Sequence, residues 1–458
     1  MRTDEANGDR VGVPEAANRA GEAPDRWSWV ERRVWTERML ATLETGPKGG
    51  KWYSLIDKVA SIDALRAGYE KVARNAGAAG VDHLSVKQFG ARLEQELKRL
   101  SDELRSGRFC PQALRRKWIP KPGTWNEKRP LGIPTVRDRV VQAALKVVLE
   151  PIFEVTFHDD SYGFRPGRRP QDALNRVQGA LSEGRTWVVD VDFRKFFDSI
   201  PHEALMAQVE ERVSDGKVLA LLRSFLKAGV LDGEEFEYTT SGTPQGGVIS
   251  PLLANIYLNG LDHLLTASGH RLVRFADDFV VLCRTEDEAQ TALTSLRQWA
   301  ETRGLSLHPD KTRVVDMDVP RAYFDFLGFR LMRHYPKDPG QPKQILRTVR
   351  PSSMQKLKTT VRPLTKRCNG RSLAEIVRRV SVALRGWHQH FRSAHRTIHA
   401  AVDGWVRRRL RSLLRKRAKR KGISRGNDHQ LWPNAFFAER GLYSLVAAHD
   451  RYVSPLGR

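Results

Sequence analysis

Cysteine is scarce in this sequence, with three residues among 458: Cys110, Cys283 and Cys368. Their wide separation excludes a disulfide framework and a Cys-x-x-Cys zinc site, which favours a reducing compartment. Long apolar runs are missing too, because no uncharged apolar run approaches the roughly 18 residues of a membrane span. The first 26 residues contain acidic side chains and no apolar core, which excludes a secretory signal. We therefore expect a cytoplasmic globular protein with no membrane partner.

Acidic residues are almost absent from one long segment of the chain. Between Lys343 and Arg425 there are 25 Lys and Arg residues but only two acids, Glu375 and Asp403. The whole chain has 78 basic and 53 acidic residues, a net charge of +25, so this segment carries nearly all of the excess. A local excess of this size predicts contact with a polyanion such as nucleic acid. The alternative is a solvated helical face, but two acids cannot neutralise 25 bases.

Apolar periodicity organises the rest of the chain. Residues 1 to about 30 are polar and without period, which predicts disorder, and residues 60–180 have a helical pattern with turn signals. Strand patterns follow at 186–193, 270–283 and 323–331. Helical patterns return at 286–303, 373–391 and 401–421. Strands and helices in alternation, with acidic residues at strand ends, indicate an α/β or α+β catalytic core.

The strongest chemical signal is a set of aspartates. In the strand at 186–193, alternation places Asp190 and Asp192 on one face, and Asp277 and Asp278 lie at the tip of the later strand pair. If the two strands are neighbours, the carboxylates converge, and like charges that close need cations to remain ionised. Oxygen-only ligands suit Mg²⁺, which predicts a two-metal phosphoryl-transfer site. Taken alone, an Asp-Asp pair is more often a polar turn, and Asp192 a strand-end cap.

The surrounding segments resemble the reverse transcriptases of bacterial group II introns. Similarity to the N-terminal extension of the family, in its group IIC branch, is found at KWYSLIDKV (51–59) and AGAAGVDHLSVKQF (76–89). The fingers are matched at 116–145 and 161–174. The palm motifs are matched at VVDVDFRKFFDSI (188–200), SGTPQGGVISPLLANIYLN (241–259), RFADDFVVL (274–282), LSLHPDKTRVV (305–315) and FDFLGFRL (324–331). The maturase domain, or domain X, is matched at LRGWHQHFR (384–392) and LWPNAFFAERGLYSLVAAH (431–449).

The resemblance implies a metal ligand set. Asp192, Asp277 and Asp278 would hold two Mg²⁺ ions, for which Mn²⁺ could substitute, with the carbonyl of Phe193 as a further ligand. Asp192 is selected over Asp190 because the metal ligand of the family lies five residues before an aromatic side chain. Strand alternation alone does not choose between them.

The resemblance also implies residues that handle the incoming nucleotide. Phe197 would exclude a ribose 2′-hydroxyl, and Gln245 would approach a base pair or the template. Lys121 and Arg129 would clamp the triphosphate, and Lys311 would protonate the departing pyrophosphate. Each has a plain alternative: a core aromatic for Phe197, a structural turn for Gln245, and ordinary surface cations for the other three.

Four domains are expected from the resemblance, in an α+β right-hand polymerase. They are a disordered tail (1–30), an N-terminal extension with fingers (31–184), a palm with the active site (185–340), and a basic helical thumb with the maturase domain (341–458). An HNH nuclease domain is not expected, because its cysteine pairs are missing from the sequence.

The implied function is RNA-directed DNA synthesis. The expected partners are dNTPs, an RNA template with a DNA or RNA primer, the group II intron RNA whose splicing is assisted, and target DNA for retrotransposition. One rival is an RNA-dependent RNA polymerase, which typically has Asp where Phe197 stands. A second is an RNA-binding maturase with little polymerase role, which the intact set of Asp192, Asp277 and Asp278 disfavours.

Overall fold

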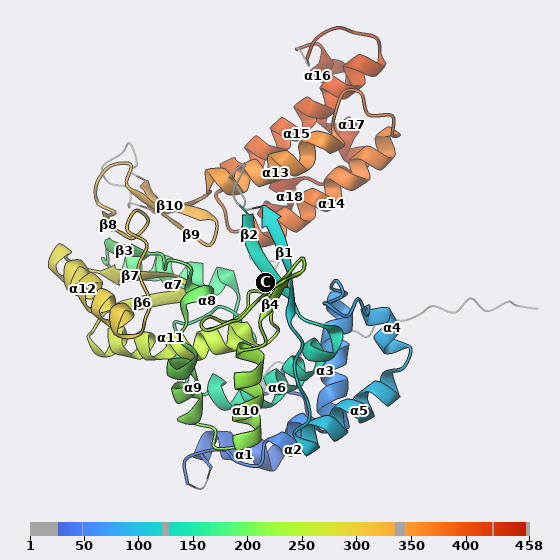
Figure 1. The fold of residues 1–458 in the computed structure, drawn as a ribbon. Helices are drawn as coiled ribbons and strands as arrows, with labels where there is room; N and C mark the ends of the chain where they lie inside the picture. The colour runs from blue at the N-terminus through green and yellow to red at the C-terminus, as the bar shows by residue number, and fades with distance from the viewer. Residues whose placement is uncertain (1–25, 48, 121–127, 335–343, 424–425, 455–458) are drawn as a thin grey trace, which may run out of the picture.

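The computed structural model describes residues 26–47, 49–120, 128–334, 344–423 and 426–454. Figure 1 shows N-terminal helices in blue, a central body in green and yellow, and a helical arm in orange and red that rises away from it. Most of the predicted disordered tail and Lys121 lie outside the described residues. None of the helices in the described ranges is long and apolar enough to cross a membrane.

Five N-terminal helices pack around one long buried helix. They are α1 (Glu37–Thr45), α2 (Ile56–Val59), α3 (Ile62–Asn75), α4 (Val86–Gly90) and α5 (Leu93–Ser106). The buried helix is α6 (Val136–Glu154), nearly all of whose residues are buried, including the polar Asp138 and Gln142. Gly68 of α3 crosses it closely, since a Cβ there would lie 2.6 Å from the carbonyl oxygen of Val140. Glycine at this position therefore permits the tight helix crossing.

A four-stranded sheet stands on this helical base. Its order is β2-β1-β4-β5, with bounds β1 (Leu114–Pro120), β2 (Lys128–Ile133), β4 (Val230–Asp232) and β5 (Glu235–Glu237). The helical pattern predicted for 60–180 is therefore wrong at β1 and β2. Most of their side chains are partly or fully exposed, so neither strand has the apolar alternation by which a half-buried strand is recognised.

The central body is built on an antiparallel sheet of order β6-β7-β3-β8. Its strands are β3 (Trp187–Val191), β6 (Arg271–Phe275), β7 (Asp278–Cys283) and β8 (Arg313–Asp316). Val189 and Val191 pack in the same core as α11 (Ser250–Ala267) and α12 (Glu286–Thr302), whereas Val188 packs in the core of α7 (Pro170–Ser182). The strands predicted at 186–193 and 270–283 and the helix near 286–303 are confirmed.

Three short helices connect β3 of the central sheet to β4 of the sheet β2-β1-β4-β5, which we call the fingers sheet. They are α8 (Phe196–Ser199), α9 (His202–Glu210) and α10 (Gly216–Leu226). A third sheet, of three strands in the order β11-β10-β9, follows the central sheet along the chain and precedes the helical arm. Its strands are β9 (Tyr323–Phe326), β10 (Phe329–His334) and β11 (Gln344–Val349). The strand predicted at 323–331 is instead a hairpin, because Leu327 and Gly328 have φ values of 51° and 82° at its turn. Leucine rarely adopts a positive φ, so this turn could not be predicted from the residue types.

The arm consists of helices that pack on one another. They are α13 (Pro351–Leu364), α14 (Leu373–Phe391), α15 (Arg396–Arg417), α16 (Asp428–Leu431), α17 (Asn434–Glu439) and α18 (Leu445–Val453). The side chain of Ser372 accepts a hydrogen bond from the Glu375 amide at 3.2 Å, which starts α14 where the sequence predicts. Helix α15 begins at Arg396, earlier than predicted. Apolar faces of α13, α14 and α15 form a core of their own, which leaves most cations outside.

A fully buried ion pair joins the central sheet to α11. Arg274 of β6 donates from Nε to Asp262 at 2.7 Å, and from Nη1 to the side chain of Asn255 at 2.9 Å and the carbonyl of Ala276 at 3.0 Å. Asn255 in turn donates to the carbonyl of Gly163 at 2.8 Å. A Cβ on Gly163 would lie 2.1 Å from the Ala276 nitrogen, so the loop before α7 packs directly on the β6–β7 turn.

We expect Arg274→Met to lower the free energy of unfolding by about 3–5 kcal/mol, because it leaves the Asp262 carboxylate buried and unpaired. Denaturant unfolding followed by tryptophan fluorescence measures the change. Adding Asp262→Asn to Arg274→Met should recover part of the loss. Arg396→Met, which removes the exposed pair with Asp450, is the matched control and should change little. Equal effects of the two arginine substitutions would contradict the structural importance of the buried pair.

Candidate active site

The predicted aspartates converge at one end of the central sheet. Strand β3 pairs with β7 so that Val191 lies opposite Phe279, and the next residues are Asp192 and Asp278. Asp277 belongs to the tight turn before β7, in which Ala276 has a φ of 61°. All three aspartates line one open cleft of about 490 Å³. The convergence that the sequence made conditional on strand pairing is therefore present.

Burial makes this cleft unfavourable for free carboxylates. It raises the pKa of Asp278 to about 7, and the neighbouring aspartates act in the same direction, against a hydrogen bond from the Leu327 amide. Burial also raises the pKa of Asp277. Burial also raises the pKa of Asp190 to about 6. The guanidinium of Arg313, whose Nε lies 3.3 Å from Asp190 Oδ2, opposes this rise. A cation bound among these groups would stabilise their ionised forms.

The donor atoms of the cleft fit a hard cation. In the isolated β-bridge between Phe193 and Leu307, the Asp192 carbonyl accepts from the His308 amide and the Arg194 amide donates to the Ser306 carbonyl. The Phe193 carbonyl takes no part in these two hydrogen bonds. Carboxylate and carbonyl oxygens are the ligands that Mg²⁺ prefers. Among the described residues, no three carboxylate, imidazole or thiol side chains already enclose a metal position. An open set of this kind suits an ion that takes its remaining ligands from phosphate and water.

Lys311 lies where the sequence predicts a cation beside the aspartates. Its Nζ is 3.2 Å from Asp192 Oδ2, while the amide of His308 donates to the Asp192 carbonyl at 2.7 Å. The sequence analysis assigned no role to four other charged residues of the cleft: Asp310, Arg313, Asp325 and Arg350. Arg350 is 3.4 Å from Asp325, and Arg313 is paired with Asp190. Arg313 and Asp325 lie within quoted motifs, but only the tertiary structure shows that their side chains line this cleft.

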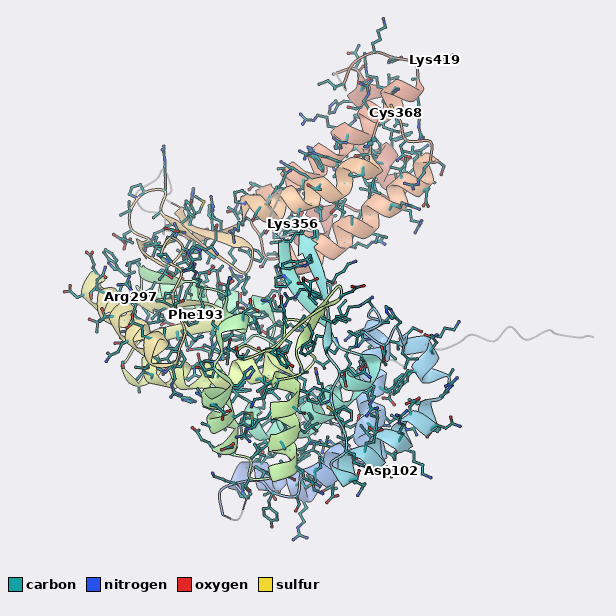
Figure 2. All side chains as sticks on the ribbon, in the orientation of Figure 1. Asp102, Phe193, Arg297, Lys356, Cys368 and Lys419 are labelled. Atoms are coloured by element: carbon teal, nitrogen blue, oxygen red, sulfur yellow. The ribbon has the colours of Figure 1, made fainter. Side chains whose placement is uncertain are left out.

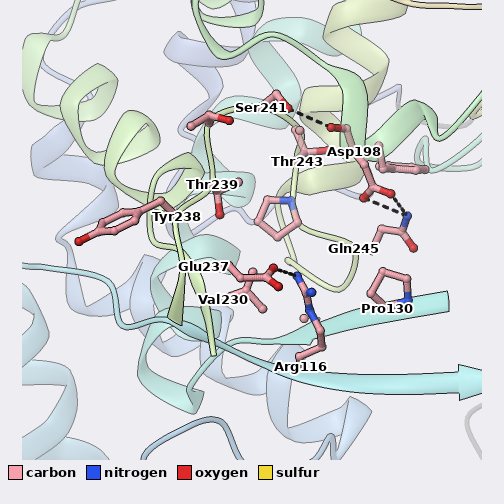
Figure 3. A pocket seen from close by; sticks show the side chains of 15 residues that line it. Arg116, Pro130, Asp198, Val230, Glu237, Tyr238, Thr239, Ser241, Thr243 and Gln245 are labelled. Atoms are coloured by element: carbon pink, nitrogen blue, oxygen red, sulfur yellow. Dashed lines mark hydrogen bonds and ion pairs between the residues drawn. The ribbon is translucent and has the colours of Figure 1, made fainter. Parts of the chain in front are cut away.

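A second cleft, of about 290 Å³, lies between the sheet β2-β1-β4-β5 and the segments that contain Phe197 and Gln245 (Figure 3). Phe197 and Gln245 both line it. The Gln245 carbonyl accepts from the Gly132 amide at 2.7 Å, and its side-chain amide donates to Asp198 at 3.3 Å. Arg116 of β1 enters from the fingers and pairs with Glu237 at 2.8 Å. The two predicted nucleotide contacts are thus brought together in one cleft.

Phe197 is not the core aromatic of this junction. Its neighbour Phe196 is 3% exposed and stacks on Phe193 with ring centroids 5.5 Å apart. Phe197 is half-buried, and its backbone carbonyl accepts from the Thr243 amide at 2.7 Å. Its ring therefore borders open space in the second cleft while its backbone is fixed.

The predicted triphosphate clamp is not assembled among the described residues. Arg129 lies on β2 opposite Ile119, with its side chain exposed, and lines neither cleft. Lys121 lies outside the described residues, so its predicted role stays a prediction.

Helix α14 of the arm is linked to Asp278 by hydrogen bonds to Leu327, in the turn between β9 and β10. His390 donates from Nε2 to the carbonyl of Leu327 at 3.1 Å, and the amide of Leu327 donates to Asp278 Oδ2 at 3.3 Å. Phe391 packs on Phe329 of the same hairpin with ring centroids 5.0 Å apart. The position of Asp278 therefore depends on a residue more than one hundred positions later in the chain.

Comparison with known proteins agrees with this geometry. Residues 119–331 match the family model described as reverse transcriptase (RNA-dependent DNA polymerase), and residues 354–432 match the group II intron, maturase-specific domain. Protein YkfC of Escherichia coli is 37% identical over 293 residues, which cover 56% of this chain and 76% of YkfC. Group II intron-encoded protein LtrA of Lactococcus lactis is 39% identical over 200 residues, 44% of this chain and 33% of LtrA. The chain thus spans about a third of LtrA.

Among solved structures, a telomerase from Candida albicans aligns with a TM-score of 0.40 and 13% identity, over 72% of this chain and 64% of that one. A score this low supports no functional inference. The central sheet with its paired aspartates, the fingers strands and the helical arm define a right-hand polymerase. The chain belongs to the family of group II intron reverse transcriptases that carry a maturase-specific domain.

We expect His390→Ala to lower kcat for primer extension by roughly 2- to 10-fold, the value of one lost hydrogen bond, with little change in KM for dNTP. The reason is that the Leu327 turn, and with it Asp278, loses its support. His390→Gln, whose side-chain amide can donate in the same direction, should retain most of the rate. His395→Ala on the arm is the matched control. A loss of kcat in the control as large as in His390→Ala would contradict this coupling.

Proposed function

We propose that this chain copies an RNA template into DNA with dNTPs, and that it binds the group II intron RNA to assist splicing and retrotransposition. The observation that carries the proposal is the convergence of Asp192, Asp277 and Asp278 in one cleft, while Phe197 and Gln245 meet in another. The first cleft can hold metal ions and phosphates, and the second can hold a sugar and base.

Asp192, Asp277 and Asp278 are the proposed ligands of two Mg²⁺ ions, with the Phe193 carbonyl as a further ligand. Reverse transcriptases generally depend on divalent metal ions. When bound, Mg²⁺ would lower the pKa of a primer hydroxyl and neutralise the triphosphate. Lys311, whose Nζ lies 3.2 Å from Asp192 Oδ2, is the proposed donor of a proton to the leaving pyrophosphate. Lys121 and Arg129 remain candidates for contact with the triphosphate.

The proposed domains follow the division expected from the sequence, with fingers up to 184, the palm at 185–340 and the thumb with the maturase domain at 341–458. The basic arm supports RNA binding, because its apolar faces are buried in their own core and its cations face outward. The proposed partners are the intron RNA, a primed RNA template and target DNA.

We expect Asp277→Asn and Asp192→Asn to reduce primer extension to background while RNA affinity stays near that of the unmodified chain, since the metal ions serve only chemistry. Gel-based extension and filter binding measure the two activities. Asp190→Asn is the matched control in the same cleft, because Arg313 already neutralises Asp190, and it should retain substantial activity. If Asp190→Asn abolishes primer extension while Asp192→Asn retains it, then Asp190 and not Asp192 is the metal ligand.

We expect Phe197→Val to raise the incorporation of ribonucleotides relative to deoxyribonucleotides by about tenfold. A clash with, or an unmade hydrogen bond to, the 2′-hydroxyl costs on the order of 1–3 kcal/mol, and each 1.4 kcal/mol is a factor of ten. Measurement of kcat/KM for both substrates on one RNA template gives the ratio. Phe196→Val should instead lower stability and slow both substrates together, because Phe196 is buried. An unchanged ratio in Phe197→Val would refute the selection of DNA precursors by this side chain.

A further inference from the structure

The arm carries an open cleft of about 440 Å³ that is separate from both clefts of the palm. It lies between the last two turns of α14 and the segment that contains α18. The side chains that matter are three arginines, two tyrosines and a histidine: Arg385, Arg392, Arg451, Tyr443, Tyr452 and His388. Among the described residues that line it there is no Asp or Glu, so its charge is positive.

Two of the arginines are already stacked on the tyrosines. The guanidinium carbon of Arg385 is 5.5 Å from the ring centroid of Tyr443, and that of Arg392 is 4.8 Å from the ring of Tyr452. Such contacts hold the flexible arginine side chains in place. Tyr452 remains 38% exposed, so part of its ring is free for a further flat group.

Two residues that line the cleft each have a buried nitrogen atom with no hydrogen-bond partner among the described residues. His388 is 8% exposed, and its Nδ1 lies 3.3 Å from the Tyr443 hydroxyl, but its Nε2 has no partner. The buried Nε of Arg392 has none either. Buried polar atoms are nearly always satisfied in folded proteins, so both side chains retain a donor or acceptor that a polar ligand could use.

The cleft faces away from the polymerase site. Arg385, His388 and Arg392 follow one another at spacings of three and four residues, which places them on one face of α14. His390 lies on the opposite side of the helix, where it contacts Leu327 of the β9–β10 hairpin. A strand bound in this cleft would therefore contact the opposite side of α14 from the aspartates.

We propose that this cleft binds one unpaired nucleotide of an RNA strand, with its phosphate among Arg385, Arg392 and Arg451 and its base stacked on Tyr452. Arginine is suited to phosphate because its planar group donates two parallel hydrogen bonds. Unpaired bases in RNA are commonly held by stacking on aromatic side chains. The inference rests on the RNA binding proposed above and names one site for it.

The experiment uses the full chain and a 12-nucleotide single-stranded RNA with 5-iodouridine at each position. Tyr452→Leu should lower affinity roughly 5- to 150-fold, the effect of one lost base stack, while Tyr452→Phe should not. Arg385→Gln should reduce the slope of log affinity against log salt by about 0.7, the value of one phosphate contact on a single strand. Irradiation should join the RNA to a peptide that contains Tyr452.

Arg297→Gln is the matched control for charge, because Arg297 is exposed on α12, at the far side of the body from the arm (Figure 2). Helix content from circular dichroism checks that every variant is folded. If Tyr452→Leu and Arg385→Gln behave like Arg297→Gln, or all cross-links map outside α14 and α18, the proposed nucleotide site is wrong while RNA binding stands. Absence of RNA binding in the unmodified chain would overturn the proposed function itself.

Discussion

The guanidinium of Arg274 is fully buried, and the position of the aspartate cleft depends on how its charge is satisfied. Asp262 and Asn255 on α11 accept from it, and so does the carbonyl of Ala276, one residue before Asp277. Because an unpaired charge at this depth is costly, the β6–β7 turn has little freedom to move relative to α11. The loop before α7 is tied to the same network through Asn255 and Gly163.

The chain separates its two kinds of charge in space. The palm gathers carboxylates that are buried enough for the pKa of Asp278 to rise to about 7, whereas the arm carries an excess of arginine and lysine around its own apolar core. The first arrangement attracts cations and the second attracts nucleic acid. The two are joined physically where α14 packs on the β9–β10 hairpin through His390 and Phe391.

Residues that lie within one motif were predictable, whereas those that meet through pairing of distant strands were not. The alternation around Asp192 and the adjacent pair Asp277 and Asp278 identified the aspartates, and Lys311 was found in the same way, from its motif. No role was assigned to Arg313, Asp325 and Arg350, although the first two lie within motifs, because their contacts are with residues distant in sequence: Arg313 pairs with Asp190, and Arg350 with Asp325. The strands β1 and β2 were missed because their exposed side chains do not alternate, and the β9–β10 turn because it places Leu327 at a positive φ.

The sequence by itself determined the local elements with strong periodicity, the excess of positive charge near the C-terminus and the family to which the aspartate motifs belong. These properties depend on neighbours along the chain, so they survive without knowledge of the fold. Only the tertiary structure decided that Phe197 borders open space while Phe196 is buried, that Asp190 is neutralised by Arg313, and that His390 supports Asp278. Each of these depends on contacts between segments far apart in sequence, whose geometry follows from packing and pairing and not from residue order.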